Sequence, residues 1–467
     1  MNAKKILNIV LLVYILLTMG ILATVMLIWI KPASFLSLFY LGPGTNRISL
    51  VVSAFLTWIL AGVLILMAFW QKITRENVVI VAGAAAISML YLAILREHVF
   101  FGDYFDYIKA AINILNKQPF HARYVYPPLW ASFLAHVYRF TGRAGAAVFA
   151  CFVINHLSIV AFFILASLFL NKCGLSLNLS CILLFLSLAI NVPVLRNMVY
   201  VQVNLLMADL ILASVLLISK SEILSALSLA LGAHVKVVPV LFLPLFLRLR
   251  KWKWLFFFLS LGLSLALLTI LTDGASYYGD FYRNLKHWNP SAFRSCTVYS
   301  FLQNTRSLFR IDLPVKAISS LVKLVLAFWV YFLAYLSIQK EIFVQSDSPL
   351  LSHLINGTVP LLFLMIVLSP TVWVYHLVIL IIPTILIFVR LGSPIEVSFF
   401  VFGYFFTFLM PAFDLYPWSY LRLAGWMILL GLMTHIIVHE KSPTWLPAVD
   451  EIVNSSIRSF FQHLDRC

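Results

Sequence analysis

Long apolar stretches separated by short polar segments dominate the sequence. A helix needs about 20 apolar residues to cross the hydrocarbon core of a bilayer, which is about 30 Å thick. Stretches of sufficient length run roughly over residues 49–70, 78–95, 145–170, 203–219, 223–247, 254–272, 312–338, 351–369, 372–390, 394–413 and 418–438. Two shorter runs, 129–141 and 179–192, are predicted to be tilted or partial spans. The pattern predicts an all-α polytopic membrane protein with about 12 to 14 transmembrane helices.

The first apolar stretch extends from Ile6 to about Trp29 and follows Lys4 and Lys5. It is longer than the apolar core of a cleaved signal peptide, and it lacks a small-residue cleavage site. We therefore expect it to be a retained first span.

Composition and charge agree with this interpretation. Of 467 residues, 63% are hydrophobic and 11% are charged, whereas a soluble domain carries about 25% charged residues. A soluble fold could not bury so much apolar surface. The net charge of +16 would suggest nucleic-acid binding in a soluble protein, but here the basic residues lie in short loops and indicate topology instead.

The basic loops predict the orientation of the chain in a plasma (inner) membrane, because Lys and Arg favour the cytoplasmic side. The basic residues used are Arg248, Arg250, Lys251 and Lys253, together with Lys4, Lys5, Lys72 and Arg75. Alternation from them places both termini in the cytoplasm and the long polar segments 96–128 and 273–311 outside. We expect an N-terminal helix pair over 1–77, a transmembrane core over 78–438, and a cytoplasmic amphipathic tail over 439–467.

The outer segment 96–128 contains the first candidate for chemistry. Asp103 and Asp106 stand three residues apart, ahead of an apolar face with helical spacing. A carboxylate that is partly removed from water has a raised pKa and can accept a proton from an attacking hydroxyl. The alternative is that either aspartate caps the N-terminus of a surface helix.

Polar residues inside the predicted spans are a second group of candidates, because they cost free energy unless they pair or line a cavity. They are Asn155, His156, Arg196, Gln202, Asn204, Asp209, His234, Lys236 and His376. Hydrogen bonds between helices could explain the amides. Lys236 lies deep in an apolar run, where it either forms a buried ion pair with Asp209 or contacts a ligand.

Other motifs are weak. His435 and His439 have a spacing that could hold a metal on one helix face, but they lie at the predicted cytoplasmic end without an evident third ligand. The five cysteines show no metal-type or paired spacing. The sequence has no Walker loop, dinucleotide-binding glycine pattern or nucleophile elbow.

Four segments in order resemble glycosyltransferase family 87, the mycobacterial-type mannosyl- and arabinosyltransferases of the GT-C superfamily. The first runs from Asp103 to Pro128 and resembles the family's Asp-aromatic-x-x-Tyr, Ala-Ala and Tyr-x-Tyr-Pro-Pro pattern. The second, Gln202-Val203-Asn204, is similar to Gly-Gln-x-Asn, with Val201 in place of the glycine.

The third segment is similar to Lys-x-x-Pro followed by an apolar run and a basic turn, with Lys236, Pro239 and Arg248 in register. The fourth resembles Ser-Pro-x-x-Trp-x-His-His. Its matching residues are Ser369, Pro370, Trp373 and His376, and Tyr375 stands where the first histidine often is. The chain departs from the family at Val298-Tyr299-Ser300, where Asn-Gln-Ser is usual, and by its additional N-terminal pair of spans.

The resemblance implies a GT-C-type bundle that catalyses inverting transfer of a sugar, most often mannose, from a polyprenyl-phosphate donor to a glycolipid or cell-envelope glycan. It implies Asp103, and not Asp106, as the general base. His376, Lys236 and Arg306 are the candidates for contacting the donor phosphate. The remaining candidate substrate contacts are Tyr126, Gln202, Asn204, Asp106 and Trp373. We expect no metal cofactor, since phosphate is already a competent leaving group, and no nucleic-acid partner.

Two other classes of function remain open. A flippase or transporter for lipid-linked glycans would also need many spans, and matching broken helices in inverted repeats would favour it; the sequence shows no such symmetry. A ligase or polymerase of lipid-linked glycans would depend on outer-loop residues such as Arg283, His287 and Arg294, and it would survive loss of Asp103.

Overall fold

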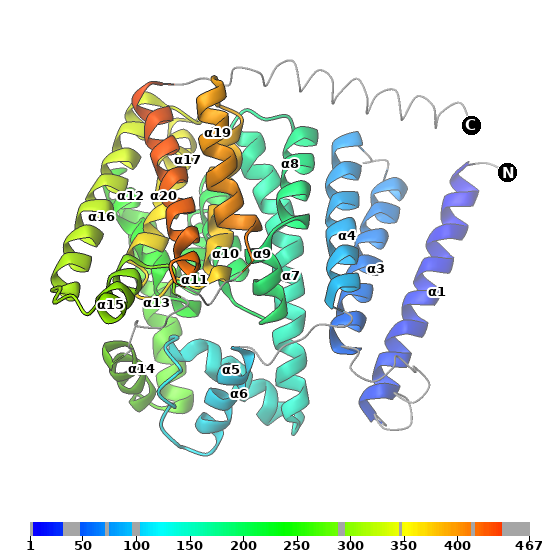
Figure 1. Ribbon diagram of the computed structural model, residues 1–467. Helices are drawn as coiled ribbons and strands as arrows, with labels where there is room; N and C mark the ends of the chain where they lie inside the picture. Colours follow the sequence, from blue (N-terminus) through cyan, green and yellow to red (C-terminus); the bar gives the residue numbers. More distant parts are fainter. Residues whose placement is uncertain are drawn as a thin grey trace. The chain divides into compact units, whose positions relative to one another are not determined.

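The computed structural model describes residues 3–30, 47–70, 74–95, 103–287, 295–344, 348–411 and 416–440 (Figure 1). In these ranges every regular element is a helix, so the all-α prediction is confirmed. The chain forms two compact units, Met1–Phe100 and Phe101–Cys467. The predicted tail over 439–467 lies almost entirely outside the described residues, as do the side chains of Lys4, Lys5, Lys72, Arg75 and Arg294.

Seven described helices are long and apolar enough to cross a membrane. They are Val52–Phe69, Glu76–Leu95, Ala144–Lys172, Trp252–Asp273, Val315–Lys340, Pro349–Leu368 and Trp418–Val438. A bent pair, Leu177–Ala189 with Val192–Val199, would add an eighth span, and shorter apolar helices accompany them. The protein is therefore a polytopic membrane protein, whereas its orientation across the membrane stays a prediction.

The first unit contains α1 (Ala3–Ile30), α3 (Arg47–Phe69) and α4 (Arg75–Leu95). Tyr14 of α1 stacks on Trp58 of α3 with 4.8 Å between ring centroids, and its hydroxyl donates to the Trp58 carbonyl at 2.8 Å. A Cβ at Gly62 would lie 2.1 Å from the Tyr14 hydroxyl, so this close approach requires glycine. The helix α4, which we had assigned to the core, belongs to this first compact unit.

The second unit contains all remaining helices. They are α5 (Tyr104–Leu115), α6 (Pro128–Thr141), α7 (Ala144–Lys172), α8 (Leu177–Ala189), α9 (Val192–Val199), α10 (Asn204–Leu217), α11 (Glu222–Val235), η1 (Val238–Phe242), α12 (Leu243–Arg248), α13 (Trp252–Asp273), α14 (Ser276–His287), α15 (Val298–Phe309), α16 (Val315–Lys340), α17 (Pro349–Leu368), η2 (Val374–Leu380), α18 (Ile381–Phe388), α19 (Pro394–Tyr404), η3 (Phe405–Leu409), η4 (Trp418–Tyr420) and α20 (Leu421–Val438).

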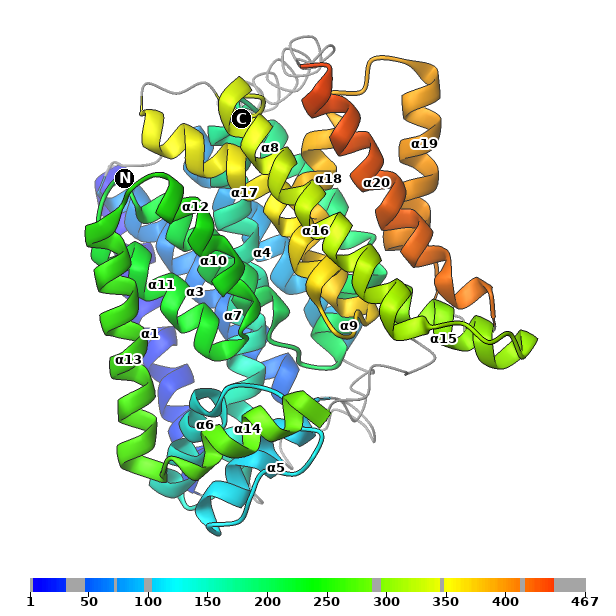
Figure 2. The same cartoon turned by 90° about the vertical axis from the view of Figure 1, so that its left-hand side faces the viewer.

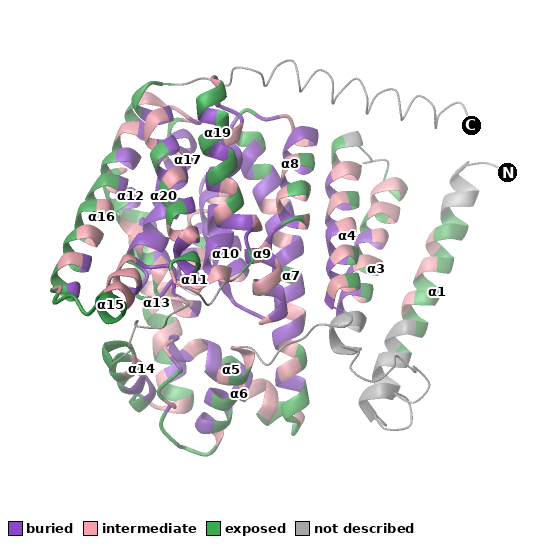
Figure 3. Ribbon diagram, in the orientation of Figure 1, coloured by how far each residue is buried: buried purple, intermediate pink, exposed green. Residues whose placement is uncertain are grey.

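Burial separates the central helices from the peripheral ones (Figure 3). The helix α17 is buried along nearly its whole length. By contrast, α13 and α16 expose large apolar side chains such as Leu271 and Phe328. Exposed apolar faces of this kind are expected where a helix meets lipid instead of water.

The short helices α5, α6 and α14 lie together at one end of the second unit, and the basic turn between α12 and α13 lies at the opposite end (Figure 2). The run 129–141 forms α6, an amphipathic helix that packs on α5 and α7. His136 and Arg139 interrupt its apolar pattern, and the tilted or partial span expected there stays a prediction.

Two predicted spans are broken instead of continuous. The run 223–247 is interrupted at Lys236, where α11 ends and the backbone is extended (φ −156°, ψ 132°) before η1. Pro239 explains the break, because it has no N–H to bond the carbonyl of Val235, four residues earlier, and its ring would clash with that carbonyl in a continuous helix. The run 372–390 begins as the 3₁₀ helix η2 after Pro370. Broken helices inside a membrane are tolerated where they are buried in protein or line a cavity.

Candidate functional site

Asp103 occupies the N-cap position of α5, yet its carboxylate makes no capping hydrogen bond. Its Oδ2 instead accepts a hydrogen bond from the Tyr375 hydroxyl at 3.1 Å, and the Gln202 amide contacts the same carboxylate. Asp106 is also committed elsewhere, because its Oδ1 lies 2.9 Å from Nε2 of His121. The capping alternative is therefore wrong for both aspartates.

The surroundings of Asp103 make its carboxylate a better base. Burial raises the pKa of Asp103 above its ordinary value of 3.8, and the negative charge of Asp106 adds to this rise. Hydrogen bonds from Gln202 and Tyr375 and the positive charge of Lys236 lower the pKa, but burial prevails. A carboxylate with a raised pKa holds an abstracted proton more firmly.

A chain of amides joins the Asp103 environment to Lys236. Gln202 accepts from the Tyr107 hydroxyl at 3.4 Å through Oε1, and its carbonyl accepts from the Asn197 amide at 3.3 Å. Asn197 Oδ1 then accepts from Asn204 at 3.4 Å, and Asn204 Oδ1 accepts from the Lys236 ammonium at 2.8 Å. The second and third motifs thus meet in one hydrogen-bonded network.

Lys236 Nζ also lies 3.0 Å from Nε2 of His376. The other ring nitrogen of His376, Nδ1, accepts the backbone N–H of Trp373 at 3.1 Å. Neither an ion pair nor a hydrogen bond joins Lys236 to Asp209 among the residues that the structure describes. The alternative of a buried Lys236–Asp209 pair is therefore wrong, and Lys236 belongs to the site.

Val201 shapes the turn that delivers Gln202 and Asn204 to this network. Its φ is +52°, and the Gln202 N–H donates to the Asn197 carbonyl at 2.9 Å across the turn. A β-branched residue in the left-handed region is strained, whereas glycine is not. This geometry explains why the motif that Gln202-Val203-Asn204 resembles has glycine at the position of Val201.

These segments surround a cavity of about 870 Å³. Its polar and aromatic lining residues are Asp103, Asp106, Arg123, Tyr126, Arg196, Tyr200, Lys236, Ser369, Thr371, Trp373, Tyr375, His376, Ser419 and Arg422. Gln202 and Asn204 lie behind this lining and are almost fully buried. With four Lys or Arg side chains against two carboxylates, the cavity favours an anionic ligand.

Arg306 is not part of this cavity. It lines a separate depression of about 450 Å³ with Arg310 and Asp312, and its guanidinium lies 3.3 Å from the Asp312 carboxylate. Its predicted contact with donor phosphate stays a prediction that the geometry does not favour.

Several cavity residues were not predicted as site residues. Arg123 and Arg422 were not singled out at all, and Arg196 was noted only as a polar residue within a span. Tyr375 was noticed only as a departure from a motif, yet it holds the carboxylate of Asp103. The sequence could have indicated Arg422 only as a cation at the start of an apolar helix. Such a position is equally typical of a helix end at a membrane surface.

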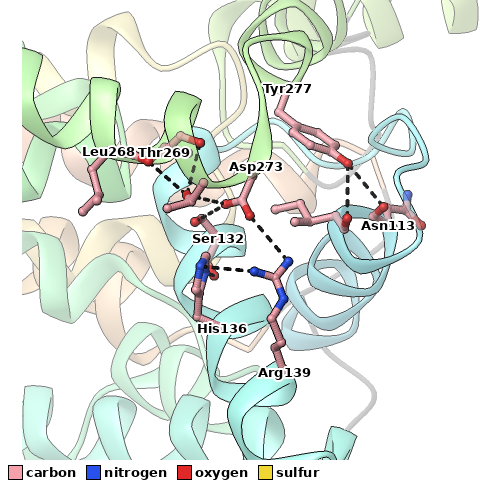
Figure 4. A network of polar contacts seen from close by, with 10 residues as sticks. Asn113, Ser132, His136, Arg139, Leu268, Thr269, Asp273 and Tyr277 are labelled. Atoms are coloured by element: carbon pink, nitrogen blue, oxygen red, sulfur yellow. Dashed lines mark hydrogen bonds and ion pairs between the residues drawn. The ribbon is translucent and has the colours of Figure 1, made fainter.

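The helices α5, α6, α13 and α14 are held together by side-chain contacts at one end of the second unit. Figure 4 shows Asp273, at the end of α13, facing Ser132 and Arg139 of α6; the Ser132 hydroxyl donates to it and the Arg139 guanidinium lies 3.9 Å away. Tyr277 of α14 donates to the Asn113 carbonyl of α5 at 3.4 Å. The helices α5 and α6 are thereby tied to α13 and α14.

The remaining histidine pair lies beside Glu396. Nε2 of His435 lies 3.0 Å from Oε1 of Glu396, and the rings of His435 and His439 are 4.5 Å apart. Across the described ranges, no group of three or more His, Cys, Asp or Glu side chains is placed to hold a metal ion.

Comparison with known proteins adds one positive finding. A family model described as glycosyltransferase family 87 matches residues 124–370, slightly more than half of the chain. The matched region includes Tyr126, Gln202, Asn204 and Lys236, while Asp103 lies before it and residues 371–376 lie after it. No curated protein matches the chain.

Proposed function

The chain belongs to glycosyltransferase family 87, and from this membership and the cavity around Asp103 we propose that it is an inverting, polyprenyl-phosphate-dependent glycosyltransferase. The expected sugar is mannose, and the expected acceptor is a glycolipid or a cell-envelope glycan. The reaction would take place at the outer face of the membrane, where α5, α6 and α14 lie in the predicted orientation.

In this proposal Asp103 is the general base. Its carboxylate takes the proton of the acceptor hydroxyl while that oxygen forms a bond to the anomeric carbon. The bond from the anomeric carbon to the phosphate oxygen breaks on the opposite face, and its electron pair leaves with polyprenyl phosphate. Attack from the opposite face inverts the configuration at that carbon.

Lys236 and His376 would bind the donor phosphate. Nζ of Lys236 and Nε2 of His376 lie 3.0 Å apart, and both side chains line the cavity. A phosphate oxygen could accept from both, and such charge-assisted hydrogen bonds strengthen as negative charge develops on the leaving group.

The wall beside Lys236 suits a prenyl chain. Val237 and Val240 line the cavity at the break between α11 and η1, and both are exposed apolar side chains. A donor phosphate on Lys236 would place the first prenyl units against this wall. Because Lys236 and the arginines already supply positive charge, the proposal includes no essential metal ion.

The observation that carries the proposal is the Asp103 carboxylate, free of helix capping and held by Tyr375 in a cavity with Lys236. The test measures transfer of radiolabelled mannose from polyprenyl-phosphate mannose to lipid extract by the purified protein and two variants. We expect Asp103→Asn to abolish transfer and Asp106→Asn, its matched neighbour, to retain a measurable rate.

The outcomes discriminate between the classes of function. Equal transfer by wild type and Asp103→Asn would contradict the role of Asp103 as base and favour the ligase alternative. If the wild type transfers neither mannose nor any sugar from a panel of other polyprenyl-phosphate donors, the result would contradict the proposed donor class.

A further inference from the structure

A second group of cations lines the cavity away from Lys236. Arg196 of α9, Ser419 of η4 and Arg422 of α20 all contribute to its wall. This group is connected to Asp103 only indirectly. The Tyr375 ring that holds Asp103 lies 6.1 Å from the Tyr200 ring, and the Tyr200 hydroxyl accepts a hydrogen bond from Arg196 at 2.9 Å.

The group contains buried donors without partners. Arg422 is 4% exposed and Ser419 is 6% exposed. One guanidinium nitrogen of Arg422 donates to the Met410 carbonyl, but its Nε and the hydroxyl of Ser419 have no hydrogen-bond partner among the residues that the structure describes. Buried polar groups without partners cost free energy. They are expected where a ligand supplies the missing acceptor.

The charges of the group are also unbalanced. Arg196 and Arg422 are near enough for their like charges to repel, and neither forms an ion pair with any carboxylate in the described part of the chain. Arg390, an equally buried arginine elsewhere, provides a contrast, because it donates to the carbonyls of Leu386, Ile342 and Phe343. The Nε of Arg390 also lacks a partner among the described residues, but its other nitrogens contact three carbonyls. Arg422 contacts one carbonyl and, unlike Arg390, lines the cavity.

We infer that Arg196, Ser419 and Arg422 form a second anion subsite, which binds a phosphate ester group other than the leaving phosphate on Lys236 and His376. Guanidinium groups match the oxygens of a phosphate, and the first turn of α20, which contains Arg422, adds the positive end of a helix dipole. The inference rests on the proposed function. It implies that the two substrates together carry two phosphate groups within this cavity.

The second phosphate has two sources with the same chemistry. It is either the further phosphate of a diphosphate-linked donor or the phosphodiester of an anionic acceptor lipid. Lys236 remains the better contact for the leaving phosphate. The base and the leaving group flank a single carbon, so the leaving phosphate must lie near Asp103, and the charge of Lys236 interacts with Asp103.

The test measures binding to the purified full-length protein in detergent. The probes are farnesyl monophosphate, farnesyl diphosphate, and mixed micelles containing phosphatidylglycerol, with phosphatidylcholine as the neutral comparison. The variants are Arg196→Gln, Arg422→Gln, Ser419→Ala and Lys236→Gln, and Arg248→Gln on the basic turn is the matched control. Melting temperatures identify any variant that fails to fold.

We expect Arg196→Gln and Arg422→Gln to raise the Kd of either the diphosphate or the phosphatidylglycerol probe about tenfold, the effect of losing a charge-assisted hydrogen bond. The Kd of the monophosphate should change by less than about twofold, except in Lys236→Gln. Weakening of the diphosphate alone assigns the phosphate to the donor, and weakening of phosphatidylglycerol alone assigns it to the acceptor.

Two results would overturn the inference. If the arginine variants weaken monophosphate binding as much as Lys236→Gln does, one phosphate contacts both groups and no second subsite exists. If no probe responds to Arg196→Gln, the group does not bind phosphate; this half-buried arginine carries the test even if Arg422→Gln does not fold. Binding requires no sugar transfer, so failure of the proposed transferase reaction would be recognised separately.

Discussion

The hydroxyl of Tyr375 donates a hydrogen bond to Oδ2 of Asp103 at 3.1 Å, across 272 residues of sequence. In the motif that the segment from Ser369 to His376 resembles, the position of Tyr375 is often occupied by histidine. A phenol in this position remains a hydrogen-bond donor at neutral pH, whereas a histidine could also accept a proton. The base of the proposed reaction is thus oriented by a group that does not compete for the proton.

Removal of this hydroxyl should move the acid limb of the pH profile. Burial raises the pKa of Asp103, whereas the hydrogen bond from Tyr375 lowers it. Tyr375→Phe should therefore raise that pKa further. The base acts when deprotonated, so kcat/KM falls as pH decreases through the pKa, and in Tyr375→Phe this fall should begin at higher pH. The measurement is kcat/KM against pH.

The neighbours of Asp103 define the control for this experiment. The pKa of Asp103 also depends on Asp106, Lys236 and Gln202, and these residues are left unchanged in both variants. Tyr200→Phe removes a hydroxyl that bonds Arg196 instead of Asp103, so its acid limb should coincide with that of wild type. A limb in Tyr375→Phe that stays in place or moves to lower pH would show that the hydrogen bond does not tune the base.

Lys236 should affect the chemical step more than donor binding. Its ammonium is positioned by Asn204 at 2.8 Å and faces His376, where negative charge would develop on the leaving phosphate. Lys236→Gln should lower kcat by about 10²- to 10³-fold, the usual effect of losing a preorganised donor to a developing anion. Donor KM and kcat are measured together to separate the two effects.

A matched lysine provides the comparison for Lys236. Lys340 lies at the other end of the unit, where it pairs with Glu440 at 2.9 Å, and Lys340→Gln should leave both kinetic parameters unchanged. His376→Ala should lower kcat less than Lys236→Gln does. An unaltered kcat in Lys236→Gln would show that the lysine does not stabilise the transition state.

The strain at Val201 can be measured against a neighbour. Val201 and Val203 are both 3% exposed, but φ is +52° at Val201 and −82° at Val203. Val201→Gly and Val203→Gly lose the same side chain, and only the first relieves left-handed strain. The unfolding free energy of Val201→Gly should therefore exceed that of Val203→Gly by about 1–3 kcal/mol.

Thermal or denaturant unfolding of the two variants in the same detergent measures this difference. Equal destabilisation would mean that the turn bears no strain at Val201. Transfer activity offers a second measurement, because relief of strain should leave Gln202 and Asn204 in place in Val201→Gly.

Features encoded locally were predictable from the sequence. Hydropathy located the long spans, and motif order brought Asp103, Lys236 and His376 together before any distance was known. The break at Lys236 and the 3₁₀ start of the run 372–390 were not predicted, although Pro239 and Pro370 supply a local signal for them. Continuous hydropathy predicts an unbroken span even where a proline lies within it.

Features that depend on distant pairing could not be predicted. The partner of Asp103 is 272 residues away, and no periodicity reports such a contact. Arg422 begins an apolar helix, where a cation is usually explained by the membrane surface. Its burial against the cavity follows only from the packing of α20 against α19 and η3.

The last prediction concerns α14, which supports the segment of the cavity wall that contains Arg123. The amide of Asn284 donates to the carbonyls of His121 at 2.9 Å and Tyr124 at 3.0 Å. His121 in turn binds Asp106 at 2.9 Å. Asn284→Ala would leave both carbonyls without this donor, at a cost of about 1–3 kcal/mol, and it should loosen the segment that supplies Arg123.

The consequence should be kinetic instead of structural. Hydrogen exchange over residues 119–126 should accelerate in Asn284→Ala, kcat should fall several-fold, and the melting temperature of the whole protein should change little, because α14 lies at the edge of the unit. Tyr282→Ala, two residues away and 67% exposed, is the control and should leave exchange in this segment unchanged. Faster exchange with normal kinetics would mean that the wall need not be rigid. Unchanged exchange would mean that the loop is held by Asp280, whose carboxylate accepts the Phe120 N–H at 3.0 Å, without help from Asn284.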